Sequence, residues 1–355
     1  MYLMYMKLLF FTRKIDKEDP KAGFVSDWVA KLANEVGFLY VLVWQKSKVD
    51  NLPKNVKLIE LPNNKVLRLW VLKFKLLKYI PKVDGVFTHM MPMYAVFVGF
   101  FTKIFRKKLI HWYMHKSVDW RLKVSNWFVD EYVSASEESF RMKTKKPINI
   151  FGHGININKF QFIDSEDKNE KFKILSVGRI SPTKNIDSFI KIAEQIQLNN
   201  PELRDKFLIQ IIGGPGLISQ QKYYLDLIEE VKEKGLNGVV DFIGPLPQEE
   251  IFEYYKNCDL FINLSDTGSI DKVVLEAMAS SKLVLTSNEA FEKILPSELF
   301  CESNDIEYLI NKIKEIYSMP EEKKKELQKQ LRYEVITNHN LDNLIKKIVK
   351  LYEKN

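Results

Sequence analysis

The stretch DTGSIDKVVLEAMASSKLVLTS, residues 266–287, combines a polar turn, a short helical pattern and an apolar strand. Residues 266–271 are rich in turn residues, and the side-chain oxygens of Ser269 and Asp271 are both suited to cap a helix. The apolar residues that follow recur at helical spacing, and Glu276 interrupts them as a single carboxylate. A helix N-terminus attracts anions, because its free N–H groups and its dipole point outward. The stretch therefore places a carboxylate one turn inside an anion-binding helix end, and we ask which ligand satisfies both.

The composition indicates a folded protein with two domains. The chain has 355 residues, which is too long for one ordinary core. Its hydrophobic share of 46% and charged share of 28% argue against a disordered chain. Only two cysteines occur, far apart, which argues against a disulfide scaffold or a cysteine zinc site and favours a reducing cytoplasm. The apolar start MYLMYMKLLFF lacks the basic region and cleavage site of a leader, so we expect a core strand there.

Strand and helix patterns alternate along the chain. We expect strands at 8–11, 38–43, 56–59, 85–88, 108–112, 132–134, 174–177, 208–212, 239–242, 260–263 and 283–286. We expect helices at 24–35, 65–79, 186–197, 219–232 and 248–257, and a charged helical tail at 320–355. This alternation predicts the α/β class, with two doubly wound, Rossmann-like parallel sheets that face a cleft. We expect the domains at 1–160 and 172–330, a polar linker at 161–171, and tail helices at 331–355 that cross back to the first domain.

The charge is divided unevenly between the two halves. Residues 1–160 carry 28 Lys and Arg against 13 Asp and Glu, hence +15, whereas the remainder carries 26 against 33, hence −7. A basic half indicates an anionic partner, either a membrane surface or nucleic acid. The segment KVLRLWVLKFKLLKYIPK, residues 65–82, mixes Leu, Trp and Phe with basic residues, as in a helix that lies on an anionic membrane. The alternative is an ordinary sheet-packing helix with a solvated basic face. The nearby KIFRKK favours the membrane, and we expect no nucleic-acid partner because no RNA-binding motif is evident.

Three glycine-containing segments follow expected strands of the second half. In LSVGRISPTKN, residues 175–185, the chain leaves a strand through Gly178. Arg179 and Lys184 then project from the carboxyl end of that strand, where a guanidinium and an ammonium suit a diphosphate. The alternative is two solvated surface cations.

The other two segments carry a weaker signal. IIGGPG places Gly213 and Gly214 after the next strand, where the backbone can approach a ligand or can simply turn. VDFIGPLPQEEI places Gly244 and Pro245 after another strand, where backbone groups can read a nucleobase edge or, again, only turn the chain.

Four segments in order resemble one known family. VGRISPTKN, IIGGPG, VDFIGPLPQEEIFEYYKNCDLFINLS and VVLEAMASSKLVLTSNEA, within residues 174–291, resemble the C-terminal half of the retaining family 4 glycosyltransferases, the glycosyl transferases of group 1. These enzymes have the GT-B fold of two facing Rossmann-like domains. The resemblance implies a retaining glycosyltransferase whose donor is a nucleotide-diphosphate sugar, such as a UDP-sugar or GDP-mannose. It also implies a lipid or glycan acceptor, with no metal and no cofactor besides the donor.

The resemblance assigns roles around the opening stretch. In the family, the second Glu of an E-x7-E motif bonds the ribose of the donor, and Glu276 matches it. The turn and helix start before that Glu hold the phosphates, which implies donor contacts here from Asp266, Gly268, Ser269, Ile270, Asp271 and Lys272. One nucleotide diphosphate thus answers the opening question, because its ribose satisfies the carboxylate and its phosphates satisfy the helix end.

The sequence departs from the family in the same turn. The family's first Glu, which contacts the transferred sugar, is here Gly268, and its Phe-Gly is Ile270 and Asp271. Either Asp266 or Asp271 supplies the missing carboxylate, or sugar selectivity differs, or activity is lost. The last case predicts an inactive nucleotide-binding partner subunit of another transferase. Lys272 either adds a cation near the diphosphate or pairs with the Glu one turn on.

The first half contributes fewer candidates. GVFTHMMPMY places His89 just after a strand, and it resembles the family's His that approaches the donor sugar. In HWYMHKS we favour His115 as a cleft residue and His111 as a core residue. His153 in FGHGININKF is a further cleft candidate, and Gly23 in KAGF is a weak match to the family's N-terminal glycine-rich loop.

The sequence also argues against other chemistries. No Asp-x-Asp follows a strand and the histidine spacing forms no metal cluster, so we expect the diphosphate to be stabilised by cations alone. A G-x-S-x-G elbow and a G-x-G-x-x-G after the first strand are both missing, which counts against a serine hydrolase and a dinucleotide dehydrogenase. We expect a cytoplasmic protein, at the periphery of the inner membrane face if the basic half binds lipid.

Overall fold

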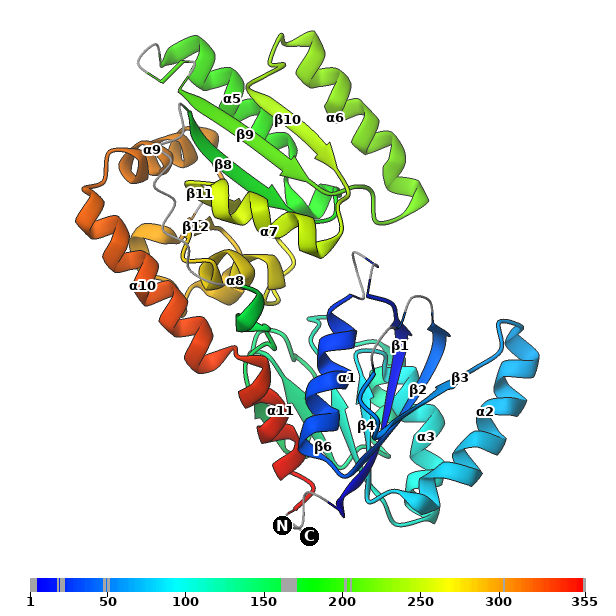
Figure 1. The fold of residues 1–355 in the computed structure, drawn as a ribbon. Helices are drawn as coiled ribbons and strands as arrows, with labels where there is room; N and C mark the ends of the chain where they lie inside the picture. Colours follow the sequence, from blue (N-terminus) through cyan, green and yellow to red (C-terminus); the bar gives the residue numbers. More distant parts are fainter. Residues whose placement is uncertain are drawn as a thin grey trace. The chain divides into compact units, whose positions relative to one another are not determined.

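The protein, in a computed structural model, forms two compact units (Figure 1). The described residues are 5–353 except 18, 20–22, 47–48, 50–51, 161–170, 201–202, 205 and 303. The first unit contains Met1–Asn156 with Asn338–Asn355, and the second contains Ile157–Thr337. The expected linker at 161–171 falls outside the described residues except for its last one. The second boundary lies near residue 338 rather than 331, because one helix continues without a break through Glu321–Asn338.

The first unit is a seven-stranded parallel sheet in the order β3-β2-β1-β4-β5-β6-β7. Its strands are β1 (Lys7–Ile15), β2 (Phe38–Lys46), β3 (Val56–Glu60), β4 (Gly85–His89), β5 (Lys108–Trp112), β6 (Glu131–Ser134) and β7 (Ile148–Ile150). Its helices are α1 (Phe24–Glu35), α2 (Lys65–Tyr79), α3 (Pro92–Ile104), α4 (Trp120–Ser125) and α11 (Leu341–Lys350). Residues 8–12 of β1 are all buried, since a central parallel strand is covered on both faces.

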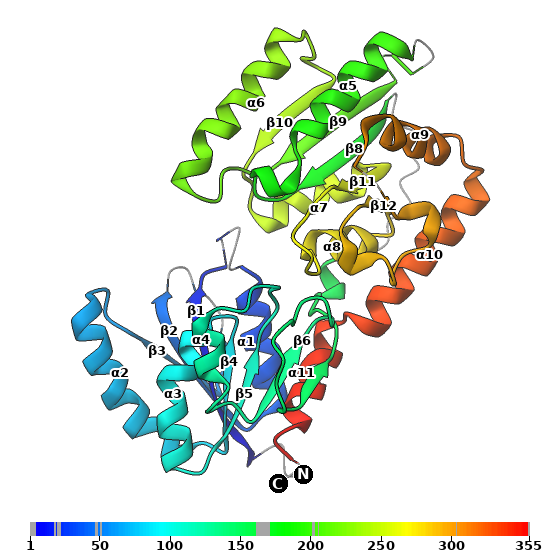
Figure 2. The ribbon, with the colours of Figure 1, turned by 180° about the vertical axis from the view of Figure 1, so that it is seen from behind.

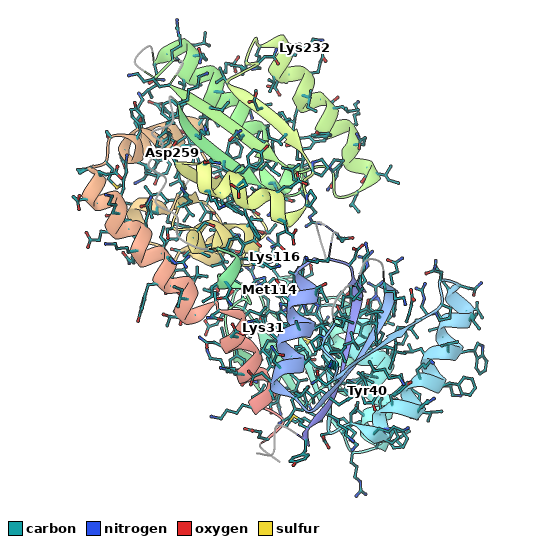
Figure 3. All side chains as sticks on the ribbon, viewed as in Figure 1. Lys31, Tyr40, Met114, Lys116, Lys232 and Asp259 are labelled. Carbon is teal, nitrogen blue, oxygen red and sulfur yellow. The ribbon has the colours of Figure 1, made fainter. Side chains whose placement is uncertain are left out.

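Helices cover both faces of this sheet (Figures 1 and 2). On one face, α2, α3 and α4 bury Leu72, Tyr94 and Leu122 in one apolar cluster with the strands. On the other face, α1 lies against α11, and Lys31 of α1 points toward α11, where it pairs with Asp342 at 2.7 Å (Figure 3). The C-terminal residues 338–355 are therefore part of the first unit.

The second unit is a five-stranded parallel sheet in the order β10-β9-β8-β11-β12. Its strands are β8 (Phe172–Val177), β9 (Phe207–Ile212), β10 (Val240–Gly244), β11 (Leu260–Asn263) and β12 (Leu283–Thr286). Its helices are α5 (Asp187–Asn199), α6 (Gln221–Glu233), α7 (Gln248–Asn257), α8 (Lys272–Ala279), α9 (Ile306–Tyr317) and α10 (Glu321–Asn338). Helices α5 and α6 lie on one face of the sheet and α7 lies on the other (Figures 1 and 2).

The prediction of two doubly wound, Rossmann-like units is confirmed. All strand pairs are parallel, with β1 against β4 and β8 against β11 at the two points where the winding direction reverses. The expected strands and helices are present with bounds that differ by a few residues. Strand β7 was not predicted from the sequence, because its three residues INI form an edge strand of the sheet with two exposed side chains and no apolar run.

Candidate active site

The winding of the second sheet reverses between β8 and β11, so the loops after these strands emerge side by side. In open α/β sheets, ligands bind at such a reversal, beyond the carboxyl ends of the strands. The two loops are joined directly, because Asp266 N–H donates to the Thr183 carbonyl at 3.0 Å and the Asn185 amide donates to the Leu264 carbonyl at 2.8 Å. The residues predicted from LSVGRISPTKN and from the opening stretch are thereby brought together.

Lys184 lies at the centre of this junction. Its ammonium donates to both carboxylate oxygens of Asp271 at 2.8 Å and to Ser265 Oγ at 3.0 Å. The Lys184 and Asp271 side chains are only 10% and 17% exposed, so the pair is largely removed from water. The cation predicted to bind a diphosphate is therefore held by an internal anion, and Ser265 is a site residue that sequence reasoning missed.

Asp271 occupies the N-cap position of α8, as expected, but it does not cap. The Asp271 side chain makes no capping hydrogen bond, because its carboxylate is directed to Lys184 instead. Asn288, from the loop after β12, donates to the Ser269 carbonyl at 2.9 Å and to the Asp271 carboxylate at 3.3 Å. The expectation that Ser269 or Asp271 caps α8 is wrong. The Asp271 carboxylate instead forms an ion pair with Lys184, which lies in the loop after β8.

Glu276 is the buried carboxylate of this site, with 4% of its surface exposed. Gln248 donates to its Oε1 at 2.7 Å, Tyr255 donates to its Oε2 at 3.1 Å, and the Lys272 ammonium lies 3.0 Å from Oε1. Lys272 was expected either to lie near the diphosphate or to pair with the Glu one turn on, and in the structure it pairs with Glu276. Burial and the neighbouring Glu276 charge raise the pKa of Tyr255 well above its usual value, so it stays a hydrogen-bond donor.

Gln248 and Tyr255 were not among the predicted site residues. Both lie on α7, and only contacts between helices far apart in sequence reveal their role. The sequence signal for them was the single carboxylate of Glu276 within an apolar helical pattern, because a carboxylate that becomes buried requires hydrogen-bond partners.

Arg179 and Lys184 line one small pocket at the end of β8. The hollow holds about 10 Å³ and is walled in addition by Gly178, Asn263 and Leu264, so it admits little more than one water. Arg179 is exposed and passes over Gly216, where an added Cβ would lie 2.9 Å from its Cδ. The two cations thus border the same edge, one exposed and one paired.

The glycines after the strands serve tight packing of the strand ends. Gly213 has a φ of +143°, and a Cβ there would lie 1.8 Å from the Gly178 carbonyl oxygen. Its N–H donates to the Gly244 carbonyl at 2.9 Å, and Gly214 accepts from Ile180 at the same distance. Position 213 therefore requires glycine for close approach of the chain to itself.

Gly214, Gly268 and Ile270 show other backbone and packing constraints. A Cβ on Gly214 would only touch Pro245 at 3.6 Å. In the turn before α8, Ile270 is buried, whereas Gly268 has a φ of +60°, a conformation that favours glycine. The backbone thus gives a reason for glycine where the resemblance expects Glu.

In the first unit, His89 lies at the equivalent reversal between β1 and β4. Its Nδ1 lies 3.4 Å from Thr12 Oγ1, and its ring packs against Trp28 at 5.1 Å and Phe24 at 6.0 Å between ring centres. Burial, with a smaller contribution from His111, lowers the pKa of His89 to about 3. His89 is thus a neutral imidazole with 6% of its surface exposed.

The other first-unit candidates have different environments. His111 is fully buried and bonded to the Thr88 hydroxyl at 2.8 Å, so its core assignment is confirmed. His115 is exposed and accepts the Ser117 N–H at 3.0 Å, whereas His153 is buried. Gly23 precedes α1 and packs closely on the preceding loop, because a Cβ would lie 2.9 Å from the Lys17 carbonyl oxygen.

The described residues contain no group of three or more His, Cys, Asp or Glu side chains placed to hold a metal ion. Within the same part of the chain, no helix is long and apolar enough to cross a membrane.

Residues 158–334 match the model of the family described as "Glycosyl transferases group 1". The segment is nearly coextensive with the second unit. A D-inositol 3-phosphate glycosyltransferase of Streptosporangium roseum is 26% identical over 141 residues, which cover 37% of this chain and 32% of that protein. One of the same name from Thermobispora bispora is 32% identical over 108 residues, 30% of this chain and 24% of that protein. The alignments span about a third or less of these curated relatives.

Two solved structures extend the likeness to the whole chain. The Anabaena protein Alr3699/HepE, in complex with UDP and glucose, is similar with a TM-score of 0.77 at 15% identity, covering 99% of this chain and 100% of that chain. Sucrose-phosphate synthase of Thermosynechococcus elongatus gives a TM-score of 0.78 at 17% identity and covers 98% of each chain. At these identities the likeness establishes the fold, and it confirms the predicted GT-B class.

Proposed function

From the match of residues 158–334 to the group 1 glycosyltransferases, we propose that this chain transfers a sugar from a nucleotide-diphosphate sugar to an acceptor. Lys184 supports this proposal most directly. Its side chain extends from the loop after β8 to Asp271 at the start of α8, which places a cation at the strand reversal.

In this proposal the charged residues of the second unit divide the donor between them. Arg179 and Lys184 bind the diphosphate and stabilise the charge that develops on it as the sugar leaves. Glu276 bonds the ribose hydroxyls, which requires the donor to share or replace its bonds from Gln248 and Lys272. His89 offers the sugar an uncharged hydrogen-bonding group, consistent with the burial that keeps it neutral.

The finer features of the reaction rest on the resemblance. We propose that the anomeric configuration is retained, that no metal takes part, and that the donor is a UDP-sugar or GDP-mannose. We propose a lipid or glycan acceptor and a peripheral position on the inner membrane face. The similar Anabaena structure holds UDP and glucose, which supports the choice of donor class.

The donor assignment is tested by calorimetric titration with UDP, GDP and ADP. We expect selective binding of one nucleotide by the wild type and its loss in the Arg179→Ala/Lys184→Ala variant. Folded protein that binds none of the three would refute the donor site. Turnover of the matching nucleotide sugars, with and without a chelator, and the anomeric NMR signal of the product then test the reaction.

Two observations favour a second candidate function, a nucleotide-binding subunit without activity. The sugar-contacting Glu of the family is Gly268 here, and the Asp271 carboxylate is already engaged by Lys184. Both candidates predict nucleotide binding, so turnover decides between them. Binding of the selected nucleotide without transfer to any lipid or glycan acceptor would favour the subunit.

A further inference from the structure

Helix α2 is apolar on the side that faces away from its own sheet. Its inner side buries Leu72, Leu76 and Tyr79. Its outer side exposes Trp70 and Phe74, with 57% and 63% of their surfaces accessible. A helix on the surface of a globular domain ordinarily carries polar residues there.

Four of the exposed apolar residues of α2 form one stripe, and Leu67 and Leu69 are exposed beside it. Val66, Trp70, Phe74 and Leu77 are all exposed and follow the spacing of four, four and three residues that aligns side chains along one helix face. Figure 3 shows side chains that project from α2 on the side away from the sheet. A contiguous exposed apolar stripe of this kind marks a surface that something covers.

The neighbouring helices on the same sheet face add further exposed rings. Phe100 and Ile104 of α3 are more than half exposed, as is Trp120 of α4. Trp127, just after α4, is 74% exposed. Helices α2, α3 and α4 share one apolar cluster with the sheet, so their outer sides belong to one surface, which we call the aromatic face (Figure 2).

The charges within the helices of the aromatic face are all positive, although Asp119 and Asp130 beside them pair with Arg121 and Lys103. Helices α2, α3 and α4 contain eight Lys and Arg and no Asp or Glu. Lys65, Lys73 and Lys78 are exposed, and the Lys73 ammonium lies 5.7 Å from the centre of the Trp70 ring. In α4, the Arg121 guanidinium lies 5.5 Å from the Trp120 ring. Rings and cations therefore lie beside one another on this surface.

We propose that the aromatic face docks on an anionic lipid bilayer, with Trp70 and Phe74 inserted at the headgroup level and the lysines bound to lipid phosphates. Indole and phenyl rings favour this layer, and basic residues beside them are attracted by anionic headgroups. The inference rests on the peripheral membrane position proposed above and not on the donor site, so vesicle binding and nucleotide binding fail separately.

Charge decides between a bilayer and the other occupants. A second copy of the chain would place lysine against lysine, because a two-fold contact brings the same surface together. Protein partners are usually met by surfaces depleted in lysine, whereas here lysine supplies every exposed cation on α2. An anionic bilayer is complementary to the excess positive charge of these three helices.

The experiment is co-sedimentation of the full chain with vesicles of phosphatidylcholine, with and without phosphatidylglycerol, at low and high salt. We expect binding to the anionic vesicles that weakens with salt. The Trp70→Ser/Phe74→Ser variant should lose about tenfold or more in partition coefficient, since it removes two inserted rings. Lys73→Gln/Lys78→Gln should lose about fivefold for each charge removed.

A matched control uses exposed apolar residues elsewhere. Leu217 and Ile218, in the second unit, are 62% and 96% exposed, and Leu217→Ser/Ile218→Ser should bind as the wild type does. Circular dichroism and urea unfolding of all variants check that they remain folded. Wild type that ignores anionic vesicles, or a Trp70→Ser/Phe74→Ser variant that binds them undiminished, would overturn the proposal. A concentration-dependent dimer that this variant abolishes would assign the aromatic face to a second copy.

Discussion

Asp271 competes with the donor for Lys184, and neutralising it should tighten nucleotide binding. The Asp271→Asn variant keeps the shape of the side chain and removes its charge. In the wild type, a diphosphate must take Lys184 from a carboxylate that accepts two bonds at 2.8 Å. In the variant, the same ammonium meets only a neutral amide.

The magnitude follows from the burial of the pair. Removal of one partner of a fully buried ion pair costs about 3–5 kcal/mol, because the other charge is left without compensation. This pair retains 10% and 17% exposure, so we take about 2 kcal/mol as the free energy that the donor must replace. That energy corresponds to about a 30-fold gain in affinity of the variant for its nucleotide diphosphate. The free energy of unfolding of the nucleotide-free variant should fall by about the same amount.

Calorimetric titration and urea unfolding measure the two quantities. A double-mutant cycle isolates the ion pair, since Asp271→Asn should no longer lower the free energy of unfolding when Lys184 is already Ala. Asp187→Asn is the matched control, because this carboxylate also pairs with a lysine at 2.8 Å, Lys191, but on the exposed surface of α5. It should change affinity by less than about threefold, as a neighbouring charge screened by solvent.

A weaker affinity in Asp271→Asn would refute the competition. It would mean that Asp271 positions Lys184 for the diphosphate rather than blocking it. A turnover assay tests a further role of Asp271, because Asp271 is also a candidate for the sugar-contacting carboxylate that the family supplies at position 268. Tighter nucleotide binding with slower sugar transfer would show that Asp271 contacts the sugar during the reaction.

Three further predictions concern the same sites. Glu276→Gln should weaken UDP by about tenfold and leave inorganic pyrophosphate unaffected in competition titrations, since it loses a ribose contact but no phosphate contact. Gly213→Ala should cost about 3 kcal/mol or more in urea unfolding, whereas Gly214→Ala should cost less than about 1 kcal/mol, because only the first introduces a backbone clash. Burial lowers the pKa of His89 and of His111 to about 3. The contribution of each buried neutral imidazole to the free energy of unfolding is fully present above the pKa of histidine in the unfolded chain, near 6.5. It is lost as the pH falls toward about 3, and the loss is about 2 kcal/mol for each histidine by pH 5. Substitution of His111 by Phe should flatten that pH dependence in urea titrations at pH 5 to 7; an unchanged slope contradicts it.

The sequence predicted the sheets well because a buried parallel strand leaves a local signature. The segments around β5, β11 and β12 are short apolar runs bounded by polar residues, and their bounds were predicted to the residue. The cations after β8 were also predictable, since a residue that follows a parallel strand must lie at the carboxyl edge of the sheet. Edge strand β7 was not, because pairing on one side only leaves no apolar pattern to read.

The pairing of the charged residues followed a different logic. Ser269 and Asp271 both have the chemistry of a helix cap, and local rules assign them to the nearest N–H groups. Asp271 instead bonds Lys184, which is distant in sequence and belongs to the loop after a neighbouring strand. A buried ammonium without an anion costs more than an uncapped helix end exposed to water, so the ion pair takes precedence over the cap.

The same argument connects the two departures from the family in the turn before α8. Position 268 has a φ of +60°, which favours glycine, so this backbone does not readily present a Glu side chain there. A carboxylate appears instead at position 271, and Asn288 holds both the Ser269 carbonyl and that carboxylate. The turn therefore keeps one acid but delivers it to Lys184. Because the backbone and the ion pair are coupled through Asn288, restoring Glu at 268 alone should not restore the family's geometry. The double variant Gly268→Glu/Asp271→Gly should change nucleotide affinity and turnover by more than the sum of the changes in the two single variants.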